Sequence, residues 1–189
     1  DELSVAMVNC VHQNSHSLGY SNWGGGTAPA RDWVQGMWFP HSDLTQRIAA
    51  HDPDVMFFAG AQLYEGGSPT RKDVANYELD YLYKWYMFCR TFGELTRSRP
   101  TVTVIDDHDI YQGNLWGASG RKTKTDNRGG YVHPAWFVKM VERTQTSHLP
   151  DPVAPEPIGQ GIGVYFTQLT YGGVGFAIIE ARKFKAGSS

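Results

Sequence analysis

The sequence has few cysteines, no long apolar segment and no basic run, and these absences narrow the classes of protein to which it can belong. Its 189 residues include two cysteines, Cys10 and Cys89, which could form at most one disulfide, so their number leaves the redox compartment open. No apolar run approaches the roughly 18 residues that span a membrane. Seventeen Lys and Arg against nineteen Asp and Glu give a net charge of -2, and no basic stretch indicates a nucleic-acid partner.

The beginning of the chain shows no targeting segment. "DELSVAMVNCVHQN" lacks the charged region, the long apolar region and the cleavage site of a signal peptide. With 41% hydrophobic and 13% aromatic residues, the chain can form a substantial core. We therefore expect one domain over residues 1–189.

Apolar runs of strand length alternate with helix-like segments, which predicts an α/β fold. The runs are 5–11, 55–59 and 102–105. The clearest helix is expected to begin at Ser68, with Pro69 at its first position and an aromatic face toward the core. Near the C-terminus, two β-rich runs joined by "YGG" predict a hairpin, so the architecture is mixed. The Gly-rich stretch 14–33 and the Pro-rich stretch 149–161 predict loops, of which the first could be a lid and the second an exposed connection.

Four of these β runs end in polar residues, and this pattern predicts a site. The groups of residues are Cys10 and His12; Gln62, Tyr64 and Glu65; the run Asp106, Asp107, His108 and Asp109; and Glu180 and Arg182. In open α/β sheets, ligands bind beyond the carboxyl ends of the strands, so these side chains are expected to converge.

Neighbouring carboxylates repel one another, and a metal ion is the natural compensator. Carboxylate, imidazole and amide groups suit divalent metals, while the Cys10 thiolate or the Tyr64 phenolate would favour iron or zinc. Plainer interpretations stay open. Asp106 and Asp107 are also common turn formers, and a cysteine at the end of a strand, such as Cys10, is more often a small buried hydrophobe than a metal ligand. Arg182 could lie at the surface or contact a substrate anion.

Four ordered segments resemble the PhoD-like metallophosphatases, also called alkaline phosphatase D proteins. The segments are "VNCVHQN", "DPDVMFFAGAQLYEGG", "RPTVTVIDDHDIYQGNLWG" and "GIGVYFTQLTYGGVGFAIIEARKFKAGSS". The resemblance implies a calcineurin-like fold of two sheets flanked by helices, incomplete on its C-terminal side. It also implies hydrolysis of phosphate monoesters or diesters by a metal-activated hydroxide, and a secreted or periplasmic location.

The resemblance also implies roles for individual residues. Cys10 and Tyr64 would bind iron, Asn114 would bind a second metal such as calcium, and zinc or manganese are alternatives. Asp107 would bind or orient a metal, His108 would contact the substrate or leaving group, and Arg182 would contact the substrate. The expected partner is a small phosphoester.

Two positions depart from the family pattern. Ala61 stands where the family has the aspartate that bridges both metals, and Ala181 stands where a second aspartate ligand is usual. A methyl group offers no lone pair to a metal. Two hypotheses follow, a metal-dependent phosphoester hydrolase and a non-catalytic module that binds an anion or a partner. A mononuclear iron oxygenase is disfavoured, because His108 and Asp109 lack its ligand spacing.

Overall fold

The computed structural model describes residues 2–12, 38–65, 76–113, 122–124 and 130–185. Among these residues, three strands form a parallel sheet in the order β1-β2-β3: β1 (Val5–Val8), β2 (Val55–Phe58) and β3 (Thr101–Thr103). Val5 of β1 pairs with Val55 of β2, and Met56 of β2 pairs with Thr101 of β3. All three strands fall within or beside the predicted runs, and the α/β prediction is confirmed.

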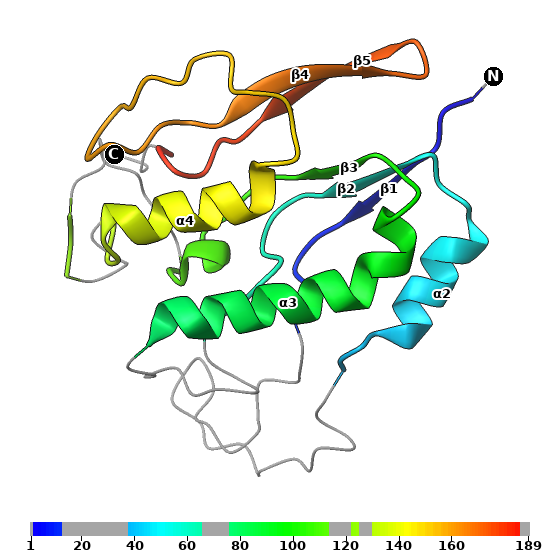
Figure 1. Ribbon diagram of the computed structural model, residues 1–189, viewed down its shortest axis with the longest axis horizontal. Coiled ribbons are helices and arrows are strands. Elements are labelled where there is room, and N and C mark those ends of the chain that lie inside the picture. Colours follow the sequence, from blue (N-terminus) through cyan, green and yellow to red (C-terminus); the bar gives the residue numbers. More distant parts are fainter. Residues whose placement is uncertain (1, 13–37, 66–75, 114–121, 125–129, 186–189) are drawn as a thin grey trace.

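Helices connect the parallel strands, as parallel pairing requires. The helix α2 (Ser42–Ala50) follows β1, and α3 (Tyr77–Thr96) joins β2 to β3. A single 3₁₀ turn, η1 (His108–Ile110), follows β3, and α4 (Ala135–Thr146) packs beside α3 (Figure 1). The hydroxyls of Tyr81 on α3 and Thr144 on α4 lie 2.6 Å apart, so the two helices are joined by a hydrogen bond.

The structure places the start of α3 later than the sequence suggested. The helix begins at Tyr77, and its N-cap is Asn76, whose side chain accepts a hydrogen bond from Leu79 N. Asparagine is among the best N-cap residues, which explains this start. Ser68 and Pro69, the expected first residues, lie outside the described part of the chain.

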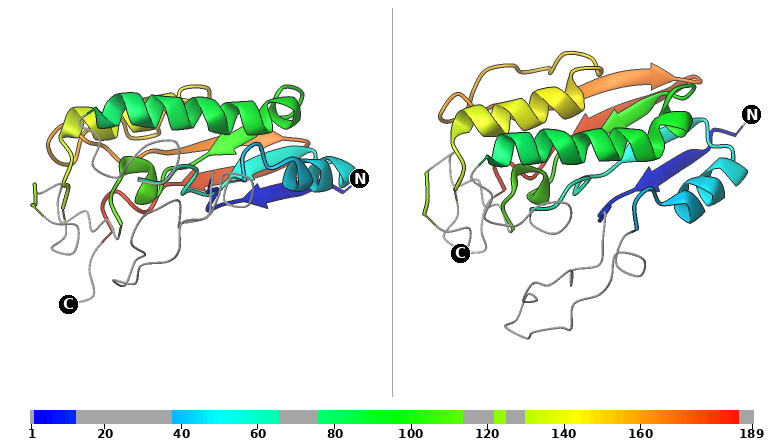
Figure 2. Two further views of the ribbon diagram at one scale, coloured as in Figure 1. Left: turned by 90° about the horizontal axis from the view of Figure 1, so that it is seen from below. Right: turned by 60° about the horizontal axis from the view of Figure 1, so that its bottom comes forward.

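The predicted hairpin is confirmed. Strands β4 (Phe166–Tyr171) and β5 (Val174–Ile179) pair antiparallel, with Tyr171 opposite Val174. Gly172 and Gly173 form the turn with φ of 58° and 77°, and two-residue hairpin turns favour glycine at such positive values. Among the described residues this hairpin is a sheet of its own, and Figure 2 shows it in two further views beside the parallel sheet.

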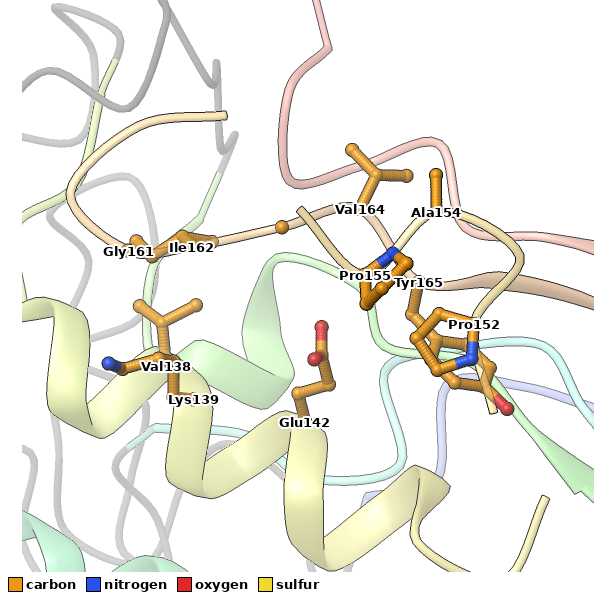
Figure 3. A pocket seen from close by; sticks show the side chains of 11 residues that line it. Val138, Lys139, Glu142, Pro152, Ala154, Pro155, Gly161, Ile162, Val164 and Tyr165 are labelled. Carbon is orange, nitrogen blue, oxygen red and sulfur yellow. The ribbon is translucent and has the colours of Figure 1, made fainter. Parts of the chain in front are cut away.

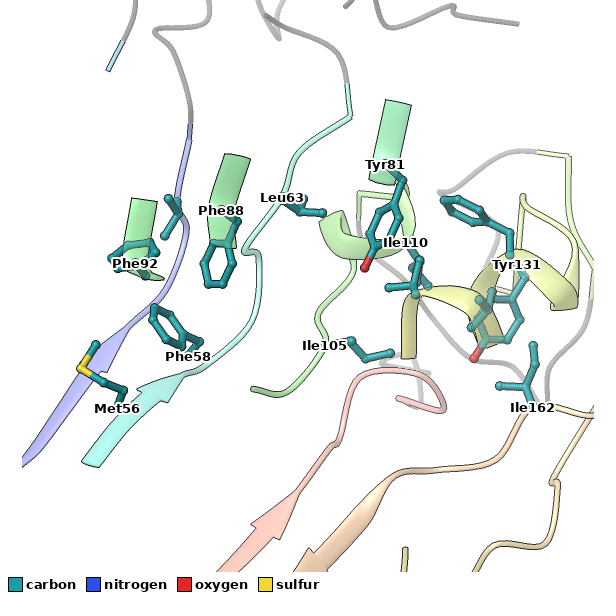
Figure 4. Packing of buried hydrophobic residues seen from close by; sticks show 14 of the residues in the cluster. Met56, Phe58, Leu63, Tyr81, Phe88, Phe92, Ile105, Ile110, Tyr131 and Ile162 are labelled. Carbon is teal, nitrogen blue, oxygen red and sulfur yellow. The ribbon is translucent and has the colours of Figure 1, made fainter. Parts of the chain in front are cut away.

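The hydrophobic core lies between the parallel sheet and the helices α3 and α4 (Figure 4). Phe58 of β2 is fully buried, and its ring meets Phe88 and Phe92 of α3 edge-on at centroid distances of 4.9 Å. Tyr81 and Phe137 extend this core between the two helices. The aromatic face predicted for α3 therefore packs against the sheet. No helix among the described residues is long and apolar enough to cross a membrane.

Candidate active site

The carboxyl ends of β1, β2 and β3 bring the predicted site residues together. The parallel pairing continues past the strands, because Cys10 N donates to Gly60 O at 3.2 Å and Val11 N donates to Ala61 O at 3.0 Å. Gly60 allows the ends of β2 and β3 to meet. A Cβ on this glycine would lie 2.6 Å from the Cβ of Asp106, so no larger residue fits without movement.

Two non-glycine residues at these strand ends have left-handed backbones. Cys10 has φ of 55° and Ala61 has φ of 52°. Residues other than Gly, Asn and Asp rarely adopt this region, and such strain gathers at functional sites. The conformation at position 61 is thus one that an aspartate or asparagine would adopt more readily than the alanine present.

Asp109 fixes the backbone around the site. Its carboxylate is fully buried and accepts hydrogen bonds from the backbone N–H groups of Ala61, Leu63 and Asp106 at 2.8, 3.2 and 2.9 Å. Gln145 of α4 donates a fourth bond at 3.1 Å. Burial raises the pKa of Asp109 to about 7, although these four donors oppose the rise. Asp109 therefore faces inward and ties the end of β2 to the end of β3.

Three rings pack together at the site, and the His12 and Tyr64 rings are stacked while the His108 ring is tilted against Tyr64. Tyr64 lies between two imidazoles, with its ring centroid 3.5 Å from that of His12 and 4.4 Å from that of His108. The Tyr64 hydroxyl is hydrogen-bonded to Cys10. Burial, this hydrogen bond and the nearby negative charges raise the pKa of Tyr64, so the phenol keeps its proton at neutral pH.

His108 forms an ion pair with Glu65. Its Nδ1 lies 2.9 Å from Glu65 Oε2. Burial lowers the pKa of His108, but the hydrogen bond and the charge of Glu65, helped by Asp107 and Asp106, outweigh burial and raise this pKa above its usual value. Glu65 therefore favours the protonated form of this imidazole beside Tyr64.

The positive charge of Arg182 offsets the negative charges of the neighbouring carboxylates of Asp106 and Asp107. Its Nε pairs with Asp106, and its Nη1 lies 3.8 Å from Asp107 Oδ2. Glu180 orients the turn that carries this arginine, because its Oε1 accepts the N–H groups of Arg182 and Lys183 at 2.8 and 2.7 Å. The turn after β5 thus reaches the ends of β2 and β3, as the sequence predicted.

The structure therefore brings most of the predicted residues together. Cys10, Tyr64, Asp107, His108 and Arg182 all belong to this cluster, while Asn114 and the stretch 14–33 lie outside the described residues. Gln62 points away from the site, and its amide bonds Val104 O and Gln145 Oε1 at 2.9 Å each.

The side chains at the site include some, but not all, of the ligands that a metal ion needs. The Cys10 thiol and the Tyr64 hydroxyl are hydrogen-bonded to each other, so one sulfur and one oxygen donor of the kind that iron or zinc accepts lie side by side. Ala61 is buried and Ala181 is exposed, and neither can bind a second ion. The described residues contain no group of three or more His, Cys, Asp or Glu side chains that could hold a metal. The described residues therefore supply only part of a metal site, and Asn114, the ligand expected for a second ion, lies outside them.

A cavity of about 230 Å³ lies elsewhere, between α4 and the Pro-rich loop (Figure 3). Glu142 of α4 points into it, Pro152 and Pro155 line the opposite wall, and none of the strand-end residues borders it. The loop itself is largely exposed, as expected for a surface connection.

Comparison with known proteins supports the fold. A structure titled "Structure of PhoD" superposes with a TM-score of 0.52 at 17% sequence identity, over 96% of this chain and 32% of that chain. The chain has a PhoD-like fold. It spans about a third of the length of that neighbour. No protein-family model matches the sequence, and no curated protein matches it.

Proposed function

We propose that this chain carries part of the active site of a metal-dependent phosphoester hydrolase of the PhoD-like, or alkaline phosphatase D, family. The supporting observation is the convergence of a thiol, a phenol, a carboxylate, an imidazole and a guanidinium at the carboxyl ends of the parallel strands. This is the position at which α/β sheets bind ligands. The substrate class is a small phosphate monoester or diester, and the proposed location is secreted or periplasmic.

The proposed metal ligands are Cys10, Tyr64 and Asp107, with Asn114 for a second ion. Iron and calcium are the proposed metals, with zinc or manganese as alternatives. A bound ion would supply Lewis acidity toward a phosphoryl oxygen and would lower the pKa of a bound water.

The chain's own residues bind the substrate and move a proton. Glu65 raises the pKa of His108 and so favours its protonated form, which can donate a hydrogen bond or a proton to the leaving oxygen. Arg182 presents a planar guanidinium suited to phosphoryl oxygens, and contact with substrate would replace part of its pairing with Asp106. The Asp109 hydrogen bonds keep the backbone beneath these groups in place.

A second candidate function is a non-catalytic module, and the alanines at positions 61 and 181 favour it. Without an ion, however, the carboxylates of Glu65, Asp106 and Asp107 outnumber the cations of His108 and Arg182. A net negative site repels a free phosphate. A non-catalytic form is therefore better suited to a protein partner than to a free anion.

Hydrolysis of aryl phosphate monoesters and diesters tests the proposal, with iron, calcium, manganese and zinc added singly and in pairs. We expect little turnover by the chain as it stands and metal-dependent turnover by the Ala61→Asp/Ala181→Asp variant. Ala61→Asn/Ala181→Asn is the matched control, because it adds side chains of similar shape without charge. The hydrolase proposal is refuted if the aspartate variant, loaded with metal, hydrolyses neither ester.

A further inference from the structure

A buried ion pair on α3 lies behind the site and has no role in the proposed chemistry. Asp80 and Lys84 are one helical turn apart, and their charged atoms are 2.9 Å apart. Asp80 is 4% exposed and Lys84 is 2% exposed. Lysine and aspartate are rarely this deeply buried, and taking both charges out of water costs several kcal/mol per ion. A pair of this kind needs an explanation.

Each residue of the pair also forms a hydrogen bond with one of the segments that follow β2 and β3. Lys84 Nζ donates to the backbone carbonyl of Tyr64 at 3.0 Å. On the other side, the Tyr111 hydroxyl donates to Asp80 Oδ2 at 2.6 Å, and Lys84 Nζ lies 5.2 Å from the centre of the Tyr111 ring. The pair therefore connects the segment after β2 with the segment after η1, and it anchors both to the rigid helix α3.

The connected segments carry the site side chains. Tyr64 is the ring packed between the two imidazoles, and Glu65, the next residue, pairs with His108. Tyr111 ends η1 in a left-handed conformation with φ of 58°, and its N–H donates to His108 O at 3.0 Å. One anchoring bond thus acts on the backbone of Tyr64 itself, and the other acts on Tyr111, which is three residues after His108 and hydrogen-bonded to its carbonyl.

Stability alone does not account for this arrangement. Replacing a buried ion pair by apolar residues of similar volume is often neutral or stabilising, so such a pair is weak evidence for a contribution to folding. A buried donor bonded to a chosen backbone carbonyl does, however, define where that carbonyl lies. Hydrogen bonds behind a metal ligand hold it in its binding orientation.

We propose that Asp80 and Lys84 are positioning residues. They hold Tyr64 and the Glu65–His108 pair in a fixed position relative to η1, in which Tyr64 can bind a metal. The inference rests on the proposed function, because it takes Tyr64 as a metal ligand. It is separable from that function, since the position of the Tyr64 ring can be measured without any metal.

The test compares three variants of the full chain labelled with 3-fluorotyrosine, with the Tyr64 resonance assigned from Tyr64→Phe. Asp80→Asn/Lys84→Met removes both charges and keeps an acceptor for Tyr111. Lys84→Gln keeps a donor for Asp80 on a side chain one bond shorter, so that it cannot serve the Tyr64 carbonyl as well. Glu94→Gln/Arg97→Met is the matched control, since this ion pair lies on the same helix with side chains 84% and 74% exposed.

We expect the double variant to unfold within about 4 °C of the unsubstituted chain, because neutralising both partners leaves no buried charge alone. The fluorine resonance of Tyr64 is expected to shift or broaden in this variant and in Lys84→Gln, and to stay unchanged in the control. Calorimetric titration with Zn²⁺ is expected to give a Kd about 10- to 100-fold weaker in both variants, the usual effect of removing a residue behind a metal ligand.

An unchanged Tyr64 resonance in Asp80→Asn/Lys84→Met and in Lys84→Gln would overturn the inference. If the double variant does not fold, Lys84→Gln alone decides. If the unsubstituted chain binds no Zn²⁺ under any condition, the metal ligation within the proposed function fails, whereas a displaced Tyr64 resonance in the variants still supports the positioning role.

Discussion

Placing a carboxylate at position 61 should make the stability of the chain depend on whether a metal is bound. Ala61 is 1% exposed, and its N–H donates to Asp109 at 2.8 Å. An aspartate there would be buried close to the carboxylate of Asp109. A buried charge without a compensating partner is strongly unfavourable, so Ala61→Asp should be destabilised when no metal is present.

Two opposing terms set the size of the effect. An uncompensated buried charge costs about 3–5 kcal/mol, whereas aspartate tolerates the left-handed backbone at φ of 52° and recovers part of the ~1–2 kcal/mol that this conformation costs alanine. A domain of this size loses about 2–4 °C in Tm for each kcal/mol of stability. In chelator, the Tm of Ala61→Asp should therefore be lower by an amount between several degrees and about 15 °C. Saturating metal at 100 times its Kd returns about 2.7 kcal/mol.

Differential scanning calorimetry of three proteins measures this coupling: the unsubstituted chain, Ala61→Asp and Ala61→Asn. Each is scanned in chelator and in excess Mn²⁺, Zn²⁺ or Fe³⁺. Only Ala61→Asp should gain substantially from metal, because the asparagine shares its shape and backbone preference without the charge. An equal gain in all three proteins, or no gain in Ala61→Asp, would refute the reasoning that position 61 faces a metal site.

Three further predictions concern pH, the site and the core. Burial raises the pKa of Glu180 to about 7, so the folded chain holds a proton between pH 4.5 and 7 that the unfolded chain loses. The contribution of Glu180 to stability should therefore fall by roughly 3 kcal/mol as pH rises through this range, and Glu180→Gln should flatten the fall when Tm is measured at pH 5, 6 and 7. Glu65→Gln should lower the pKa of His108, measured by NMR titration, because it removes the main group that raises this pKa; an unchanged value would contradict the ion pair. Phe58→Ala should cost about 3–5 kcal/mol in urea unfolding, and a loss under 1 kcal/mol would show that the core around it is loosely packed.

Much of the fold is readable from the sequence, because its signals are local. Short apolar runs marked the three parallel strands, and the Gly-Gly pair marked the hairpin, since positive φ at both turn residues has few other solutions. The start of α3 was missed because Ser68 and Pro69 form an equally good local start signal. Local capping rules cannot choose between two such signals when packing decides the outcome.

The site was predictable as a convergence of strand ends, whereas the direction of each side chain was not. The residue types and spacing alone did not separate the four residues from Asp106 to Asp109, and only the family resemblance singled out Asp107 and His108. Asp109 faces inward to bond backbone N–H groups, while Asp106 faces Arg182. That division depends on the η1 turn, which rotates successive side chains to different sides. The Asp80–Lys84 pair was hidden for another reason, because a Lys four residues after an Asp usually indicates an exposed helix face.

The charges at the site couple the binding of a metal ion to the binding of a phosphoester. Glu65, Asp106 and Asp107 contribute three negative charges, and Arg182 and protonated His108 contribute two positive ones, which leaves one net negative charge. A phosphate monoester brings up to two further negative charges into a partly buried region, where repulsion is screened less than in water. A cation near Tyr64 reverses the sign of this balance. In a hydrolase built on this site, the metal and the phosphoester should therefore each strengthen the binding of the other, and chelation should weaken substrate binding as well as turnover.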